Sequence, residues 1–136
     1  MPYVKLWEPR GVVKRFSGFV TGDEFAASVR AIASDPRFDG LRYIISHFLD
    51  IDGHGVDARA LREAAISRLG SVHTNPNIRV MVVTADPAVA AFKTGIEVHA
   101  PVYDTRIFTT EAEARDWFAA QPPMHDLPPG YRGLGN

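Results

Sequence analysis

The residues best suited to chemistry gather in one short segment, SHFLDIDGHGVD, at residues 46–57. Two histidines and three aspartates lie within its twelve residues. Imidazoles and carboxylates are the side chains that most often bind metal ions and transfer protons. Aspartates and glycines are also typical of a polar turn between buried elements. The segment is therefore a candidate metal or catalytic site, or a solvated connection between a strand and a helix.

A calcium loop that starts at Asp50 fits this segment only in part. Asp50, Asp52 and Gly55 occupy the first, third and sixth positions of such a loop. The fifth position holds His54, which offers nitrogen where oxygen is needed, and the twelfth holds Leu61 instead of a bidentate glutamate. The preceding residues also have the pattern of a strand rather than a helix. The spacing therefore argues against calcium.

A zinc or iron site would use His47, Asp50, Asp52 and His54 together, since imidazole and carboxylate suit these metals. In an extended chain, however, successive side chains alternate between two faces. His47, Leu49 and Ile51 then point to one side, and Asp50 and Asp52 point to the other. We therefore expect no metal and no cofactor.

The start of the following helix is a candidate anion site. Gly53-His54-Gly55 lets the backbone approach a ligand closely, and arginines follow in the first helical turns. Free amides at a helix start attract anions, although Asp57 as the cap competes for the same amides. The candidate ligand- or partner-binding residues are thus Asp50, Asp52, His54, Asp57, Arg59 and Arg62. The alternative that the segment is only a capped polar turn stays open.

The elements around this segment alternate between strands and helices. Residues 3–8, 12–20, 41–49, 78–84 and 102–108 have strand patterns, and helices are expected at about 21–34, 57–72, 86–96 and 109–118. This order predicts an α/β fold with a single mixed, mostly parallel sheet, an N-terminal hairpin and about four helices. We expect one domain over residues 1–121. Residues 122–136, with four prolines and three glycines, are expected to form a tail.

The amino-acid composition excludes several classes of function for this protein. Fifteen lysines and arginines stand against sixteen acids, for a net charge of −1, so nucleic acid is not an expected partner. The chain has no cysteine, which excludes disulfides and thiolate chemistry. It shows neither the apolar core of a signal peptide nor a membrane span. These features predict a cytoplasmic protein.

Several stretches together resemble the STAS fold of anti-sigma-factor antagonists, in its SpoIIAA-like branch. They are GFVTGDEF, LRYIISHFLDIDG, IRVMVVTAD and DTRIFTTEAEARDWF, which together with their neighbours span residues 3–120. The closing phenylalanine, alanine and tryptophan of that family approximately match Phe108, Ala114 and Trp117. The resemblance implies a non-enzymatic module that binds a protein partner or small ligand near the 50–57 segment. It also implies a homodimer, for which Tyr3 and Trp7 in the leading edge strand are a candidate surface.

Phosphorylated antagonists of that family carry a serine at the start of the second helix. This chain has no serine or threonine between Asp50 and Ser67, and Asp57 stands at about the place of the phosphoacceptor. The resemblance therefore implies a helix start that lacks the phosphorylation switch.

Two alternatives to this module rest on weaker resemblances. The string FLDIDGHGV is similar to the nucleophile motif of haloacid-dehalogenase-type phosphatases, with Asp50 as nucleophile, Asp52 as general acid, and Thr84 and Lys93 in support. His54 replaces the threonine of that motif, and no later strand ends in the paired acids that hold magnesium. The other alternative is a carrier of apolar ligands, since lipid-transfer domains of the CRAL-TRIO type share features of this architecture.

Overall fold

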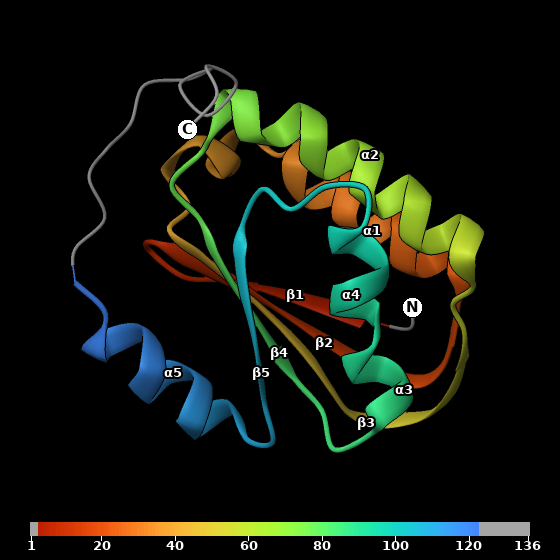
Figure 1. Cartoon of the computed structure of the whole chain (residues 1–136). Helices are drawn as coiled ribbons and strands as arrows, with labels where there is room; N and C mark the ends of the chain where they lie inside the picture. Colours follow the sequence, from red (N-terminus) through yellow and green to blue (C-terminus); the bar gives the residue numbers. More distant parts are fainter. Residues whose placement is uncertain (1–2, 123–136) are drawn as a thin grey trace.

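A five-stranded sheet in the order β1-β2-β3-β4-β5 forms the centre of the molecule (Figure 1). The structure is a computed structural model, and it describes residues 3–122. The strands are β1 (Tyr3–Trp7), β2 (Gly11–Thr21), β3 (Tyr43–Gly55), β4 (Arg79–Val83) and β5 (Asp104–Phe108). β1 runs antiparallel to β2, and all the other neighbours are parallel. The predicted mixed sheet with an N-terminal hairpin is confirmed.

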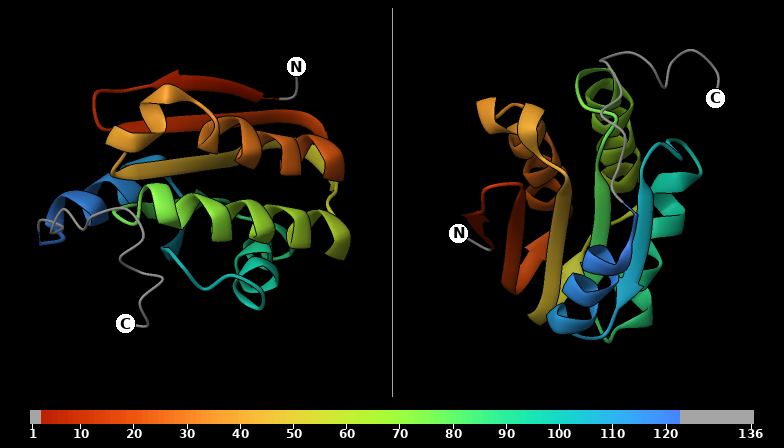
Figure 2. Two further views of the ribbon diagram at one scale, coloured as in Figure 1. Left: turned by 90° about the horizontal axis from the view of Figure 1, so that it is seen from above. Right: turned by 90° about the vertical axis from the view of Figure 1, so that its left-hand side faces the viewer.

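Helices cover the two faces of the sheet unequally. They are α1 (Gly22–Ala33), the 3-10 helix η1 (Pro36–Gly40), α2 (Ala58–Thr74), α3 (Pro87–Ala90), α4 (Phe92–Glu97) and α5 (Glu111–Ala120). α1 and α2 lie side by side along one face, which α4 also covers (Figure 2). Among the helices of residues 3–122, α5 packs on the other face, against an apolar cluster that includes Val13, Ile45 and Met81. The helix that was expected at 86–96 is interrupted at Ala91 and forms α3 and α4.

Local capping explains where the longer helices begin. Thr21 and Glu24 form a capping box, in which each side chain accepts a hydrogen bond from the other's backbone N–H, at 3.1 and 2.8 Å. Asp57 caps α2 by accepting from the N–H of Ala60 at 2.9 Å. The cap at Asp57 is at the position predicted from the sequence. Among residues 3–122, no helix is long and apolar enough to cross a bilayer.

The segment at 50–55 was expected to be a loop, and that prediction is wrong. β3 continues to Gly55, with Asp50 opposite Ser17 and His54 opposite Val20 of β2. β4 pairs with β3 only as far as His47, so residues 48–55 extend β3 as a ribbon with β2 alone. Register shifts bend this ribbon, beside a glycine of β2 at φ 65°. Backbone pairing with the long partner strand overrides the low strand preference of aspartate and glycine.

The predicted dimer surface on β1 is also different in the structure. Tyr3 stacks on Phe16 of its own chain at 5.2 Å between ring centroids, and the Arg37 guanidinium lies 3.9 Å above the Trp7 ring. Both aromatic side chains therefore pack within their own chain and are half-buried. Homodimerisation stays a prediction. The predicted tail lies outside the described residues, apart from Pro122.

Candidate functional site

The residues singled out at the end of β3 do not converge on one point. Asp50 and Asp52 are exposed on the ribbon formed with β2. His47 is buried on the α5 face of the sheet, where it lies between Arg15 and Val83 in the strand register. No group of three or more acids, histidines or cysteines within residues 3–122 is arranged to hold a metal ion. The constellation that would make a metal site is therefore spread over two faces of the sheet.

His54 has a structural environment. Its Nδ1 accepts a hydrogen bond from the N–H of Val56 at 3.0 Å. Its ring meets Phe92 edge-on, with 4.9 Å between the centroids. The imidazole thereby fixes the turn that leads from β3 into α2 and connects this turn to α4.

Acidic side chains surround the start of α2, and they disfavour the binding of an anion there. Its exposed depression is lined by Asp23, Asp57 and Glu63, with Arg59 as the cation. Arg59 is already paired with Glu63 at 3.2 Å, and the Asp57 carboxylate, as the cap, accepts from the N–H of Ala60. Arg62 is exposed and does not line the depression. This geometry favours the capped connection over the anion site.

The phosphatase alternative lacks an assembled site in the described part of the chain. Asp52 and Thr84 line one open depression together, but Asp50 and Lys93 do not reach it. The Thr84 hydroxyl accepts from the N–H of Asp86 at 3.0 Å, and Lys93 pairs with Glu97 at 2.8 Å. The four residues that the motif would use are therefore engaged elsewhere or separated.

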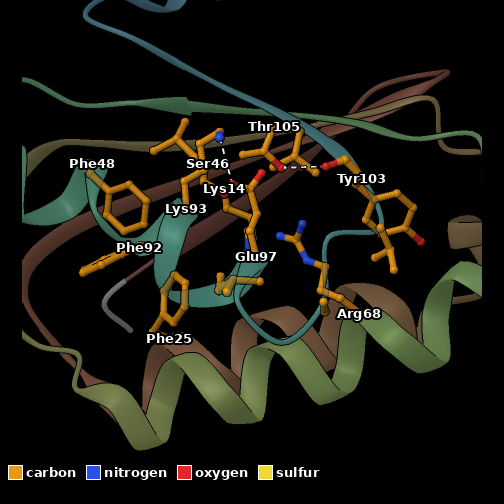
Figure 3. Close-up of a pocket in the computed structure, with 15 residues that line it drawn as sticks. Lys14, Phe25, Ser46, Phe48, Arg68, Phe92, Lys93, Glu97, Tyr103 and Thr105 are labelled. Carbon is orange, nitrogen blue, oxygen red and sulfur yellow. Dashed lines mark hydrogen bonds and ion pairs between the residues drawn. The ribbon is translucent and has the colours of Figure 1, made fainter.

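A different site lies inside the molecule, between the sheet and helices α1, α2 and α4. It is a cavity of about 30 Å³ (Figure 3). Its polar lining comes from Lys14 of β2, Ser46 of β3 and Arg68 of α2, with the Lys93–Glu97 pair of α4 at its edge. The rest of the lining is mostly apolar and comprises Phe25, Phe48, Val80, Val82, Phe92, Ile96, Ala100 and Val102, beside Tyr103 and Thr105.

Lys14 is placed in the cavity by the alternation of β2. Every second side chain of β2 points to the face of the sheet that α1, α2 and α4 cover, namely Val12, Lys14 and Phe16. Lys14 is only 2% exposed. Its Nζ donates to Ser28 Oγ of α1 at 3.3 Å. Burial, together with the smaller effect of the nearby positive charge of Arg68, lowers the pKa of Lys14 to about 7.

Arg68 comes from the opposite side of the cavity. It lies on the buried stripe of α2 that also contains Ala60, Ala64 and Val72, and it is 9% exposed. Figure 3 shows its guanidinium directed from α2 toward the cavity. The guanidinium lies 5.8 Å from the centre of the Tyr103 ring, and it makes no hydrogen bond or ion pair to any of residues 3–122. Burial lowers the pKa of Arg68, but an arginine does not lose its proton in a protein.

Ser46 completes the set of donors. It lies beside Lys14 in the parallel register of β2 and β3, and it is buried. Its hydroxyl has no hydrogen-bond partner among the residues that the structure describes. The hydroxyls of Tyr103 and Thr105, in contrast, already donate hydrogen bonds to backbone carbonyl oxygens, at 2.8 and 3.2 Å.

Helix α4 closes the cavity because it approaches α2 very closely. At Gly95, an added Cβ would lie 2.5 Å from Cδ1 of Leu61. Phe92, one turn earlier, packs against Phe25 and Phe48 with 5.3 and 5.9 Å between ring centroids. Because residue 95 is a glycine, the short helix α4 can place the ring of Phe92 over the cavity that contains Lys14 and Arg68.

The sequence interpretation missed this cavity. The available signals were a lysine at an inward position of β2, between Val12 and Phe16, and an arginine at an inward position of α2, between Ala64 and Val72. The alternation of a strand and the repeat of a helix each predict an apolar residue at such a position. A lysine or arginine found there therefore indicates a buried charge.

Comparisons with known proteins agree with this architecture. The unphosphorylated anti-sigma factor antagonist SpoIIAA superposes with a TM-score of 0.58 over 88% of this chain and 99% of its own, at 16% sequence identity. This chain has a SpoIIAA-like fold. A protein of the DUF3478 family from Shewanella loihica, also described as SpoIIAA-like, has a TM-score of 0.49 over 85% of this chain and 90% of its own, at 13% identity. No family model matches the chain, and no curated protein matches it. The STAS-like resemblance seen in the sequence is thus confirmed for the fold.

Proposed function

We propose that this protein is a non-enzymatic binding module of STAS-like fold that holds a small anion in the cavity between Lys14 and Arg68. The observation that carries the proposal is Arg68, a residue that is only 9% exposed and whose guanidinium has no acceptor among residues 3–122. A buried charge without a partner is strongly destabilising, by several kcal/mol in typical proteins. A bound anion would supply the missing partner.

The lining of the cavity supports binding rather than catalysis. Lys14, Ser46 and Arg68 are donors, and most of the other lining residues are apolar. The one carboxylate among the lining residues, Glu97, is held by Lys93 at 2.8 Å. Such a lining can neutralise and orient an anion, which is the usual arrangement of a small-ligand pocket.

A regulatory role follows as a proposal from the fold relative. SpoIIAA is described as an anti-sigma factor antagonist, and we propose that this chain also regulates a protein partner. The candidate contact is the end of the molecule that carries Asp50, Asp52 and the start of α2. Phe19 supports this choice, since its ring lies over Gly53 and Gly55 and is 57% exposed. A cytoplasmic location belongs to the same proposal.

Thermal unfolding tests the proposed function. The wild type, Arg68→Met and Arg62→Met are heated with sodium chloride, acetate, sulfate or phosphate, against sodium gluconate at the same ionic strength. At least one anion should raise the Tm of the wild type and of Arg62→Met, because Arg62 is exposed on the same helix. The same anion should leave Arg68→Met unchanged. Equal shifts in Arg68→Met, or no shift in the wild type with any of the four anions, would contradict the proposal.

A further inference from the structure

We infer that the anion is a single chloride ion, held in the cavity that Lys14, Ser46 and Arg68 line. This inference rests on the proposed function and deepens it, since it names the ion that the cavity accepts. It follows from the size, the hydrogen-bond donors and the charge of the cavity.

The cavity has room for one water-sized group. It measures about 30 Å³, which is about the volume that one molecule occupies in liquid water. On the same scale an enclosed benzene requires about 150 Å³. A carboxylate, sulfate or phosphate therefore does not fit in the present packing, whereas chloride is one atom and only slightly larger than water. The same volume gives no support to the predicted carrier of apolar ligands.

The polar lining suits an anion better than a water molecule. A protonated lysine and an arginine only donate hydrogen bonds. The Lys14 Nζ donates one hydrogen to Ser28 at 3.3 Å and has others free, and the Arg68 guanidinium donates to none of residues 3–122. A water molecule would accept from these groups, but it must also donate two hydrogens, and it carries no charge. Chloride accepts from several directions at once, because it is spherical, and it neutralises a cation.

The charge of the cavity suits one monovalent anion. Arg68 contributes one permanent positive charge. Lys93 and Glu97 pair at 2.8 Å and neutralise each other. The lowered pKa of Lys14, about 7, means that this lysine keeps only part of its charge at neutral pH. One negative charge is therefore balanced by Arg68 alone, and it gains a second partner when Lys14 is protonated.

The walls of the cavity favour chloride among the halides. Removing an ion from water costs more as its radius falls, so fluoride is the most costly to bring in. Phe48, Val82 and Phe92 form apolar walls that leave no room for the water that fluoride would retain. Iodide is the largest of the four and exceeds the space. An exposed cationic surface has no such size limit, so there the affinity rises steadily from fluoride to iodide.

Chloride binding should become tighter as the pH falls. The ion stabilises protonated Lys14, so binding takes up a proton wherever the free site has lost one. Above pH 7 the affinity should fall by up to about tenfold per pH unit, and below pH 7 it should level off. The charged and polar groups that contact Lys14 or line the cavity with it are Ser28 on α1, Ser46 on β3, Arg68 on α2, Lys93 and Glu97 on α4, Tyr103 and Thr105, with exposed Lys5 opposite it on β1. None of these side chains normally titrates between pH 6 and 8.5.

Chloride itself is the probe for this inference. The width of the ³⁵Cl NMR line is followed in sodium gluconate as the full chain is added, from pH 6 to 8.5, and the other sodium halides are added as competitors. We expect a Kd on the order of 1 mM, which corresponds to satisfying one buried charge that lacks a partner. Bromide should compete nearly as well as chloride, and fluoride and iodide should be about tenfold weaker.

Variants of the full chain separate the donors. Arg68→Met should abolish the saturable broadening of the ³⁵Cl line. Lys14→Met should weaken binding and remove its pH dependence, and Ser46→Ala should weaken it severalfold with the pH dependence retained. Lys5→Met and Arg62→Met are matched controls at exposed positions and should bind as the wild type does. Ser46→Ala is the mildest of these changes, so it keeps the test valid if the substitution of a buried cation prevents folding.

A crystal soaked in sodium bromide locates the ion. An anomalous-difference peak should lie in the cavity within contact of Arg68, and bromide peaks confined to the surface would overturn the inference. An affinity that rises steadily from fluoride to iodide would likewise show binding to exposed cations. Chloride affinity that does not change between pH 7 and 8.5 would contradict the place of Lys14 in the site.

Two further outcomes separate this inference from the proposed function. If chloride does not bind, but acetate, sulfate or phosphate raises the Tm of the wild type and not of Arg68→Met, the choice of ion is wrong and the anion cavity stands. If no anion binds in a way that depends on Arg68, both proposals are wrong.

Discussion

The end of β3 and the cavity under α4 present their charges in opposite ways. At the end of β3, Asp50 and Asp52 are exposed to water, and Asp57 is satisfied by the backbone of its own helix. In the cavity, Lys14 and Arg68 are buried, and neither forms an ion pair with a carboxylate of residues 3–122. The first region contains the residue types that active sites use. The second contains the unbalanced buried charge that is typical of a binding site.

This difference teaches that burial and partners, rather than residue types, distinguish a binding site from a polar surface. An exposed aspartate is solvated and costs the fold nothing, so it needs no ligand to explain it. A buried arginine without an acceptor does need an explanation. The following predictions test this contrast, from the largest expected effect to the smallest.

Phe92 joins the two regions, because it contacts His54 on one side and Phe25 and Phe48 on the other. Phe92→Ala should lower the free energy of unfolding by about 3–5 kcal/mol, since it removes a buried aromatic ring and leaves a void. Phe19→Ala is the matched control at an exposed position and should cost less than about 1 kcal/mol. Urea denaturation measures both, and equal losses would show that the aromatic cluster is not a packed core.

Arg68→Met should stabilise the protein in the absence of anions. The substitution removes a buried charge without a partner and retains most of the volume, so a gain of about 1–4 kcal/mol in the free energy of unfolding is expected. Arg62→Met should change it by less than about 0.5 kcal/mol. The measurement is urea denaturation at low salt, and a loss of stability in Arg68→Met would mean that the guanidinium has an acceptor in the free protein.

The stability of the free protein should increase between pH 7 and pH 9. Burial lowers the pKa of Lys14 from 10.5 to about 7, so over this range the unfolded chain binds more protons than the folded one. The free energy of unfolding should rise by up to about 1.4 kcal/mol per pH unit from this group. Lys14→Met should remove this slope, whereas Lys5→Met should keep it. A wild-type curve that is flat across this range would contradict the burial of Lys14.

Substitutions at the end of β3 should separate the cap from the exposed acids. Asp57→Ala should lower the free energy of unfolding by about 0.5–2 kcal/mol, because it removes the cap of α2. Asp50→Ala and Asp52→Ala should each change it by less than about 0.5 kcal/mol. Thermal unfolding compares the three variants. A large loss at Asp50 would restore the possibility that this carboxylate has a partner.

The fold was predictable where local interactions determine it. The capping box at Thr21 and Glu24, and the proline at the first position of α3, are read from neighbouring residues, and the structure has both. The strand patterns also gave the correct number and order of strands, because burial imposes a period of two or a continuous apolar run.

The rest depends on contacts between distant segments. β3 extends to Gly55 because β2 offers it a partner, and nothing in the residues 50–55 themselves indicates this pairing. Lys14 and Arg68 are 54 positions apart in the sequence, and only the register of the sheet and the rotation of α2 bring them to one cavity. The residues of the cavity are each ordinary in the sequence, and their chemistry arises from their shared burial.

The close approach at Gly95 gives a way to redesign the site. Because Leu61 and Gly95 set how tightly α4 is held against α2, they determine the room beneath α4 without supplying any donor. Leu61→Ala would enlarge the space and Gly95→Ala would force the helices apart, while Lys14, Ser46 and Arg68 remain in place. The room beneath α4 and the charge that lines it are thus encoded in separate residues, so an engineer can alter the size and the charge of the cavity independently.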